Sequence, residues 1–102
     1  MEESMRDLLP FMNEQGQLVA LPAKHKKRLK AYYFLATKLE SGKQYTESEI
    51  NDLLNQWAVF GDPATLRREL YNKYLLNRTN DCGQYWREEP LPSLEEFIAK
   101  YV

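Results

Sequence analysis

The sequence has few of the residues from which disulfides, zinc sites and nucleophilic sites are built. Its 102 residues include one cysteine, Cys82, and one histidine, His25. A single cysteine excludes a disulfide within the chain, as in proteins of reducing compartments, so we expect a cytoplasmic protein. A tetrahedral zinc site would need two carboxylates in addition to His25 and Cys82, so no metal or other cofactor is expected.

Long apolar runs and the motifs of common enzymes are also missing. No stretch reaches the roughly 20 apolar residues that a membrane-spanning helix needs, and the start, Met1-Glu2-Glu3, lacks the basic flank of a signal peptide. There is no Walker loop, no GxGxxG and no HExxH motif. We therefore expect no enzymatic activity. A nucleophilic pair of Cys82 and His25 is the catalytic alternative, but Cys82 falls in an expected turn and His25 among lysines.

The composition is that of one soluble globular domain spanning residues 1–102. It is 43% apolar and 28% charged, and this length allows an ordinary hydrophobic core. The net charge of −1 hides an uneven distribution, because residues 24–87 hold twelve Lys or Arg against seven Asp or Glu. Residues 1–23 and 88–102 each hold one basic residue against four acidic ones. A basic middle is compatible with an anionic partner, although many nucleic-acid binders carry a larger excess.

Residues 45–74 predict two helices separated by a short turn. Thr46 and Glu49 have the spacing of a capping box, in which each side chain bonds a backbone N–H at the start of a helix. Apolar residues follow at the spacing of one helical face: Ile50, Leu53, Leu54 and Trp57. Asp62 and Pro63 are typical of a second helix start, as N-cap and first helical residue. This helix is expected to reach about residue 74, with a buried side made of Leu66, Leu70 and Tyr74.

A β-hairpin is expected directly after these helices. Leu76–Thr79 and Gln84–Arg87 are short strand-like segments, and the turn-prone residues 80–83 connect them. Gln44-Tyr45 could add a further short strand beside the hairpin. A helix, a tight turn, a basic helix and a hairpin in this order are typical of a winged helix-turn-helix. We therefore expect an α+β, mainly helical fold with a small β-hairpin wing.

The N-terminal part is expected to hold a short helix, an extended segment and a longer helix. Residues 3–9 favour the short helix, closed by Pro10, with three apolar residues on one face: Met5, Leu8 and Leu9. Residues 11–22 contain a turn-prone stretch and then an apolar one, which favours a small extended segment. Ala23–Leu39 predicts a helix that is apolar over so much of its surface that we expect it to pack on two sides.

Residues 88–102 are expected to form a linker and a final helix outside the domain core, which spans about residues 11–87. Glu88–Pro92 makes a stiff linker, and Ser93 with Glu96 forms a second capping box. The helix that follows is amphipathic, so it must pack on the domain or on a partner.

Several blocks of the sequence together resemble one bacterial family. In chain order they are Phe11-x-Asn13-x-x-Gly16-x-Leu18, Pro22-Ala23-Lys24, Lys27-Arg28, Tyr45-Thr46-Glu47-x-Glu49-Ile50-Asn51, Thr65-Leu66-Arg67-Arg68-Glu69-Leu70 and Tyr85-Trp86-Arg87. From about Phe11 to Arg87 the chain is similar to the bacterial domain-of-unknown-function family number 2087. The resemblance implies a winged-helix-like fold and a regulatory setting, since some members are fused to helix-turn-helix transcription regulators; it implies no activity. Cys82 departs from the pattern at a turn position where glycine is expected, so a reshaped turn is expected here.

The candidate nucleic-acid-binding residues lie on the expected second helix, the hairpin and the basic run after residue 23. On the helix, Arg68 lines up with Thr65 and Asn72 on a polar face whose residue types reach base edges or phosphates. Arg67 falls about 100° away; it is a further candidate, or it braces the two helices by pairing with Glu69, Glu47 or Asp62. The side chains expected at phosphates are Lys24, Lys26, Lys27, Arg28, Lys73, Arg78 and Arg87. A solvated surface is the plainer explanation of the basic run.

Two functions from different classes fit this sequence. A nucleic-acid-binding winged-helix protein in bacterial transcription regulation, with DNA as its partner, is favoured by the basic middle of the chain. A protein-interaction or dimerisation module on the same scaffold is favoured by the near-neutral net charge, two tryptophans, seven tyrosines and the C-terminal helix. We favour the first, and salt-dependent binding to a duplex separates the two.

Overall fold

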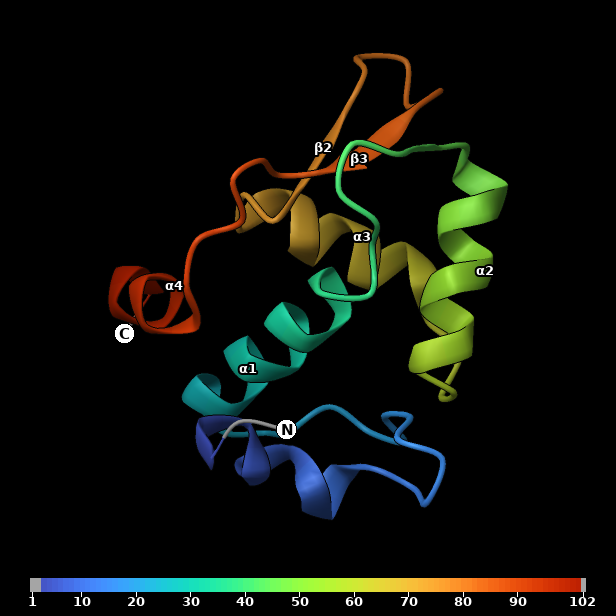
Figure 1. Cartoon of the computed structure of the whole chain (residues 1–102). Coiled ribbons are helices and arrows are strands. Elements are labelled where there is room, and N and C mark those ends of the chain that lie inside the picture. Colours follow the sequence, from blue (N-terminus) through green and yellow to red (C-terminus); the bar gives the residue numbers. More distant parts are fainter. Residues whose placement is uncertain (1–2, 102) are drawn as a thin grey trace.

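The computed structural model describes residues 3–101, which form five helices and a small antiparallel sheet (Figure 1). In chain order the elements are η1 (a 3-10 helix, Glu3–Phe11), α1 (His25–Ala36), β1 (Gln44–Tyr45), α2 (Glu47–Trp57), α3 (Pro63–Asn72), β2 (Leu76–Arg78), β3 (Tyr85–Arg87) and α4 (Leu94–Tyr101). The expected α+β, mainly helical class is confirmed. Within residues 3–101, none of the helices combines the length and apolar character needed to cross a membrane.

The two central helices begin where the sequence predicts. The hydroxyl of Thr46 accepts a hydrogen bond from the Glu49 N–H at 3.1 Å, and the Glu49 carboxylate accepts one from the Thr46 N–H at 2.8 Å. This exchange confirms the capping box of α2. Asp62 caps α3 and Pro63 opens it, as expected.

The end of α3 differs from the prediction. The helix stops at Asn72 instead of continuing to residue 74. Tyr74 has a left-handed backbone, with a φ of 60°, which a helix cannot continue through. Its side chain is 61% exposed, so the expected burial of Tyr74 beside Leu66 and Leu70 is wrong.

The hairpin and a strand from the loop after α1 form one antiparallel sheet. β3 lies in the middle of the order β1-β3-β2, with Tyr45 opposite Tyr85 and Leu76 opposite Arg87. The predicted hairpin and the short strand at Gln44-Tyr45 are therefore confirmed. Tyr45, Leu76 and Tyr85 are buried and join the sheet to the hydrophobic core.

The hydrophobic core receives side chains from all five helices and from the sheet. Its largest fully buried members are Leu8, Leu18, Leu29, Leu35, Ile50, Leu54, Leu66, Leu70, Leu75, Leu76, Tyr85 and Phe97. On the apolar side expected for α2, Ile50 is buried, whereas Leu53 and Trp57 are only half-buried and pack against the core from outside. The expected burial of Leu66 and Leu70 is confirmed. From α1, Leu29 is buried and Tyr33 is half-buried.

The N-terminal helix is narrower than expected. η1 is a 3-10 helix, in which residues three apart share a face. Met5 and Leu8 are buried at this spacing, whereas Leu9 falls on another side and is 55% exposed, so its expected place beside them is wrong. Pro10 lies inside the helix and does not close it. After η1, Leu18 makes single β-bridges to Met12 and to Ala58. These bridges connect the expected extended segment to the residues that directly follow η1 and α2.

α1 is shorter than the predicted helix over residues 23–39. No side chain caps it at Lys24, and Lys38 and Leu39 continue only as tight turns, with N–H groups bonded to the carbonyls three residues earlier. The expected packing on two sides is confirmed, because α1 contacts η1, α3 and α4. α4 packs against α1 through Phe97, whose ring centroid is 5.8 Å from that of Tyr33. The capping box of Ser93 and Glu96 starts α4 as expected.

Candidate nucleic-acid interface

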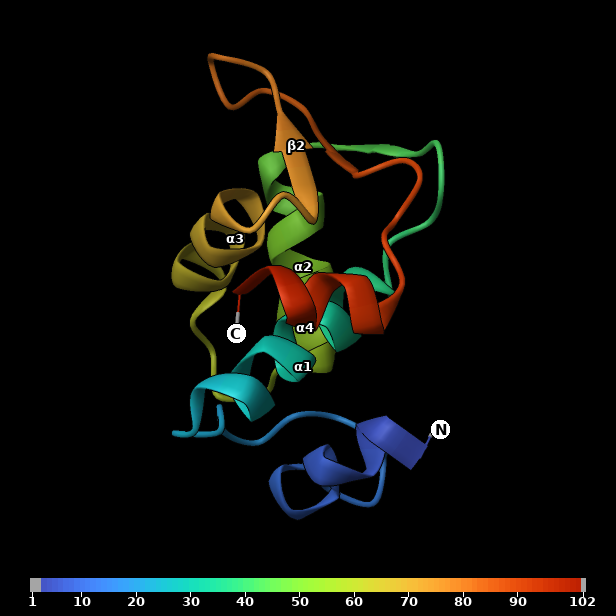
Figure 2. The same cartoon turned by 90° about the vertical axis from the view of Figure 1, so that its left-hand side faces the viewer.

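α3 exposes one long side because its other side is anchored in the core. Leu66 and Leu70 are buried. Arg68, Tyr71 and Asn72 lie away from them and are exposed. In Figure 2 the hairpin stands above α3 along the same edge of the molecule. One partner can therefore touch both elements.

A hollow of about 280 Å³ lies between α3 and the hairpin, and we call it the arginine hollow. Its lining residues are Ala64, Arg67, Arg68, Tyr71, Asn72, Arg78, Cys82 and Tyr85. Three of them are arginines, and no carboxylate of the described residues lines it. A concave surface with charge of one sign concentrates ions of the opposite sign.

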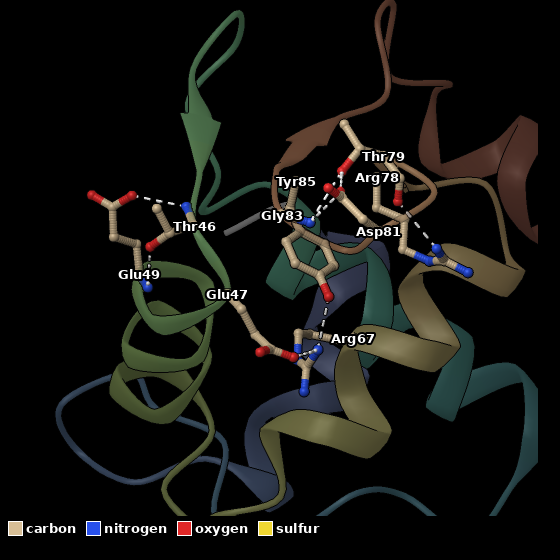
Figure 3. A network of polar contacts seen from close by, with 9 residues as sticks. All are labelled: Thr46, Glu47, Glu49, Arg67, Arg78, Thr79, Asp81, Gly83 and Tyr85. Carbon is tan, nitrogen blue, oxygen red and sulfur yellow. Dashed lines mark hydrogen bonds and ion pairs between the residues drawn. The ribbon is translucent and has the colours of Figure 1, made fainter.

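Arg67 is engaged inside the protein. Its Nη1 donates to Glu47 Oε1 at 2.8 Å and to the hydroxyl of Tyr85 at 2.9 Å, as Figure 3 shows. These contacts join α3 to the first turn of α2 and to β3. Burial raises the pKa of Tyr85, the adjacent Cys82 adds to the rise and the Arg67 charge opposes it. The contacts match the alternative in which Arg67 braces the helices; a contact to nucleic acid stays a prediction.

Arg68 and Arg78 have more freedom at the arginine hollow. Arg68 is exposed and makes no hydrogen bond or ion pair with another described residue. The guanidinium of Arg78 lies 4.4 Å from the centroid of the Tyr71 ring, and its Nη1 donates to the Thr79 carbonyl at 3.2 Å. This stacking holds Arg78 between hairpin and helix, with donors left over for a ligand.

The turn of the hairpin is held by a compact set of hydrogen bonds (Figure 3). Asp81 Oδ1 accepts from the Thr79 hydroxyl at 2.6 Å and from the Gly83 N–H at 2.9 Å. These donors, the hydroxyl first, hold the pKa of Asp81 below its ordinary value. Cys82 takes a left-handed backbone with a φ of 61°, the conformation that glycine adopts without strain. Cys82 therefore occupies the backbone conformation that the expected glycine would favour.

The basic run at the start of α1 does not gather at the arginine hollow. Lys30 is buried and pairs with Asp7 of η1 at 2.7 Å. That hydrogen bond is the main cause of a lowered pKa for Asp7, with smaller contributions from the charges of Lys27 and Lys26. Arg28 instead lies near Tyr32, on the side of α1 that meets α3. The run is thus divided between two sides of α1.

Three other predicted contact residues lie outside the arginine hollow. Lys73 pairs with Glu69 at 3.0 Å, and its ammonium lies 5.6 Å from the ring centroid of Tyr32. Arg87 pairs with Glu89, which holds the pKa of that carboxyl below its ordinary value. Thr65 is half-buried in the first turn of α3 and is not among the lining residues. Of the helix and hairpin candidates, the structure therefore brings together Arg67, Arg68, Asn72 and Arg78.

His25, the single histidine of the sequence, makes a contact between two helices. His25 Nε2 lies 2.8 Å from the backbone carbonyl oxygen of Tyr101, which links the start of α1 to the end of α4. Among residues 3–101, no three His, Cys, Asp or Glu side chains come together as metal ligands could.

A protein-family model matches most of the chain. Residues 17–87 match the family described as "Uncharacterized protein conserved in bacteria (DUF2087)". No curated protein and no solved structure gives a significant match. The match includes every element from α1 to β3, and with them the whole arginine hollow. The chain therefore belongs to this uncharacterized bacterial family.

Proposed function

We propose that the protein is a winged-helix protein of the bacterial cytoplasm that binds DNA in transcription regulation. The order α1-β1-α2-α3-β2-β3, with sheet order β1-β3-β2, supports this proposal because winged helices connect their elements in this way. In it, α3 is the recognition helix and the β2–β3 hairpin is the wing. A recognition helix places its exposed side chains in the major groove.

The observation that carries the proposal is the position of Arg68, Asn72 and Arg78 around the arginine hollow. Arg68 and Asn72 extend from the exposed side of α3, and Arg78 reaches the same hollow from the hairpin. Arginine recognises guanine edges and asparagine recognises adenine edges, while either can bond a phosphate. Arg68 and Asn72 thus read bases, and Arg78 holds a phosphate beside them.

Arg67 supports the same interface from within. Its bonds to Glu47 and Tyr85 set the position of α3 relative to α2 and to the hairpin. The lysines at the start of α1 add phosphate contacts outside the arginine hollow. Such contacts set affinity and register, and the side chains at base edges set sequence preference.

A protein-interaction module is the second candidate, and exposed aromatic surface favours it. Tyr71 is 39% exposed and Tyr74 is 61% exposed, at the end of α3 and just after it. Tyrosines are enriched at protein interfaces, where their rings bury area and their hydroxyls find partners. Asp81 places a carboxylate in the hairpin turn, where it repels a phosphate.

Duplex binding at several salt concentrations tests the proposal. With about four to six phosphate contacts, log affinity should fall linearly with log salt, with a slope of about −4 to −5. Arg68→Ala should cost about 1–3 kcal/mol at a preferred site and reduce the preference between sequences. Arg6→Ala is the matched control, because Arg6 is exposed on η1 and lies outside the arginine hollow. Absence of binding at low salt, or equal effects of both variants, would support the protein-interaction module instead.

A further inference from the structure

A second, larger hollow lies at the opposite end of the fold from the hairpin. Its volume is about 520 Å³, within the range of roughly 300–1,000 Å³ that is typical of small-molecule sites. We call it the tryptophan hollow. Its apolar lining comes from η1, the segment after it, α1 and the last residue of α2: Met5, Met12, Tyr33, Phe34 and Trp57. Figure 1 shows these segments below and beside α1.

The lining of the tryptophan hollow includes the ammonium-bearing side chain of Lys38. Lys38 lines it, and its Nζ lies 4.2 Å from the centroid of the Trp57 ring and 4.9 Å from that of Phe34. The two rings meet edge to face, with centroids 6.3 Å apart. Lys38 makes no ion pair with a described residue, and no described carboxylate lines this hollow. Its ammonium is therefore held in place by rings and lacks an anion.

The walls of the tryptophan hollow are held by hydrogen bonds within the protein. Asn13 Oδ1 accepts from the N–H groups of Gln15 and Gln17, each at 3.0 Å. The Leu18 N–H donates to the Trp57 carbonyl at 2.8 Å, which fixes this segment to the end of α2. A site built in advance binds a small ligand without first ordering its own chain.

We propose that the tryptophan hollow binds a small aromatic carboxylate. The aromatic body lies against Trp57 and the two methionines, whose flexible and polarisable side chains adapt to varied shapes. The carboxylate pairs with Lys38 Nζ at the rim. This ligand meets both features of the site, an apolar lining and an unpaired cation. The proposal does not depend on DNA binding, because the arginine hollow lies between other elements.

The test uses the fluorescent aromatic anion 1-anilinonaphthalene-8-sulfonate with the full chain. Saturable binding at one site is expected, and 2-naphthoate should displace the probe at a concentration about fivefold lower than its neutral analogue 2-naphthamide. This ratio corresponds to one partly shielded ion pair. Lys38→Met should weaken probe binding about fivefold and make the two competitors equal.

Two control variants separate Lys38 from other cations. Lys43→Met removes a lysine that also lies over a ring, 4.9 Å from the Tyr45 centroid, but outside the tryptophan hollow. Arg68→Ala removes a charge from the arginine hollow. Both should leave probe affinity unchanged, with melting curves confirming that every variant is folded.

A blocking variant tests the apolar part of the site. Thr37 is exposed and lines the tryptophan hollow, so Thr37→Trp should fill it and abolish probe binding without removing a charge. The proposal is overturned if the wild type shows no saturable binding, if naphthamide competes as well as naphthoate, or if Lys38→Met behaves like Lys43→Met. Full binding by Thr37→Trp would overturn it as well.

Discussion

The arginine hollow and the start of α1 are the two most basic parts of the molecule, and they use their charge differently. The start of α1 has the higher density of charge in the sequence, with five Lys or Arg: Lys24, Lys26, Lys27, Arg28 and Lys30. Of these, Lys30 is buried and pairs with Asp7. The arginine hollow has only three arginines, but Arg68 among them makes no hydrogen bond or ion pair with a described residue.

 

The comparison shows that charge in a sequence is not yet charge available to a partner. At the start of α1, the charge of Lys30 is neutralised by its ion pair with Asp7. Arg28 lies on a different side of the helix from Lys26 and Lys27. At the arginine hollow, Arg67 takes the internal role and leaves its neighbour Arg68 exposed. The three arginines are fewer, but they surround one hollow, whereas the charges at the start of α1 are divided between two sides of the helix.

The largest expected effect is a loss of stability when the packing of α4 against α1 is removed. Phe97 is 2% exposed and packs between Tyr33 and Tyr101, with ring centroids at 5.8 and 5.3 Å. Phe97→Ala should lower the free energy of unfolding by about 3–5 kcal/mol, measured by urea denaturation. Ala99→Ser, at an exposed position of the same helix, should stay within about 0.5 kcal/mol. A loss below about 1 kcal/mol for Phe97→Ala would show that α4 does not support α1.

The second prediction sets the two adjacent arginines against each other. Arg67→Ala leaves Glu47 and the Tyr85 hydroxyl without their partner, and we expect a loss of about 1–3 kcal/mol in stability. Arg68→Ala removes no hydrogen bond or ion pair with a described residue and should change stability by less than about 0.5 kcal/mol. Thermal unfolding of both variants measures the difference. Equal losses would contradict the division between a bracing and a free arginine.

Much of the fold could be predicted because its signals are local. Thr46 with Glu49, Asp62 with Pro63, and Ser93 with Glu96 are short-range patterns that start helices, and each one is observed. The ends of helices were harder to predict. After α3, Tyr74 has a left-handed backbone, and a tyrosine in the sequence does not indicate this conformation. The sequence also did not predict that η1 is a 3-10 helix, because the pattern of Met5, Leu8 and Leu9 fits an α-helix as well.

The candidate site could be predicted only in part because it depends on contacts between distant residues. Arg68 and Asn72 share a helix, so their common side follows from their spacing. Tyr71 is three residues after Arg68 and could have been found in the same way. The stacking of Arg78 on Tyr71 requires the position of the hairpin, and the bonds of Arg67 require that of α2. The tryptophan hollow joins residues as distant as Met5 and Trp57, which no sequence pattern connects.

The third prediction tests whether the start of α1 contributes phosphate contacts. Lys26→Ala should weaken binding to every duplex sequence alike and make the salt slope shallower by about 0.9. Arg6→Ala is again the control, since Arg6 is exposed but belongs to the acidic N-terminal part of the chain. Fluorescence anisotropy over a series of salt concentrations measures both slopes. An unchanged slope for Lys26→Ala would restrict the interface to the arginine hollow and its surroundings.

The smallest expected effect compares one carboxylate from each region. Asp7 beside α1 and Asp81 in the hairpin turn both have a pKa below the ordinary value of 3.8. The cause for Asp7 is the bonded and charged Lys30, whereas for Asp81 it is the neutral hydroxyl of Thr79 and then the Gly83 N–H. Because the folded-state pKa is lowered, each ionised carboxylate stabilises the folded protein at pH values above 3.8. This contribution is lost as the pH falls through the folded-state pKa.

Nuclear magnetic resonance titration of the two carboxyl groups separates these causes. Salt at about 1 M shortens the screening length to roughly 3 Å, so it should raise the pKa of Asp7 more than that of Asp81. Lys30→Met, which keeps the length of the buried side chain, should raise the pKa of Asp7 alone. Thr79→Val should raise the pKa of Asp81 alone, because it removes the hydroxyl that donates at 2.6 Å. If Lys30→Met left the Asp7 titration unchanged, Asp7 would not neutralise the charge of Lys30, and all five Lys and Arg side chains at the start of α1 would offer their charge to a partner.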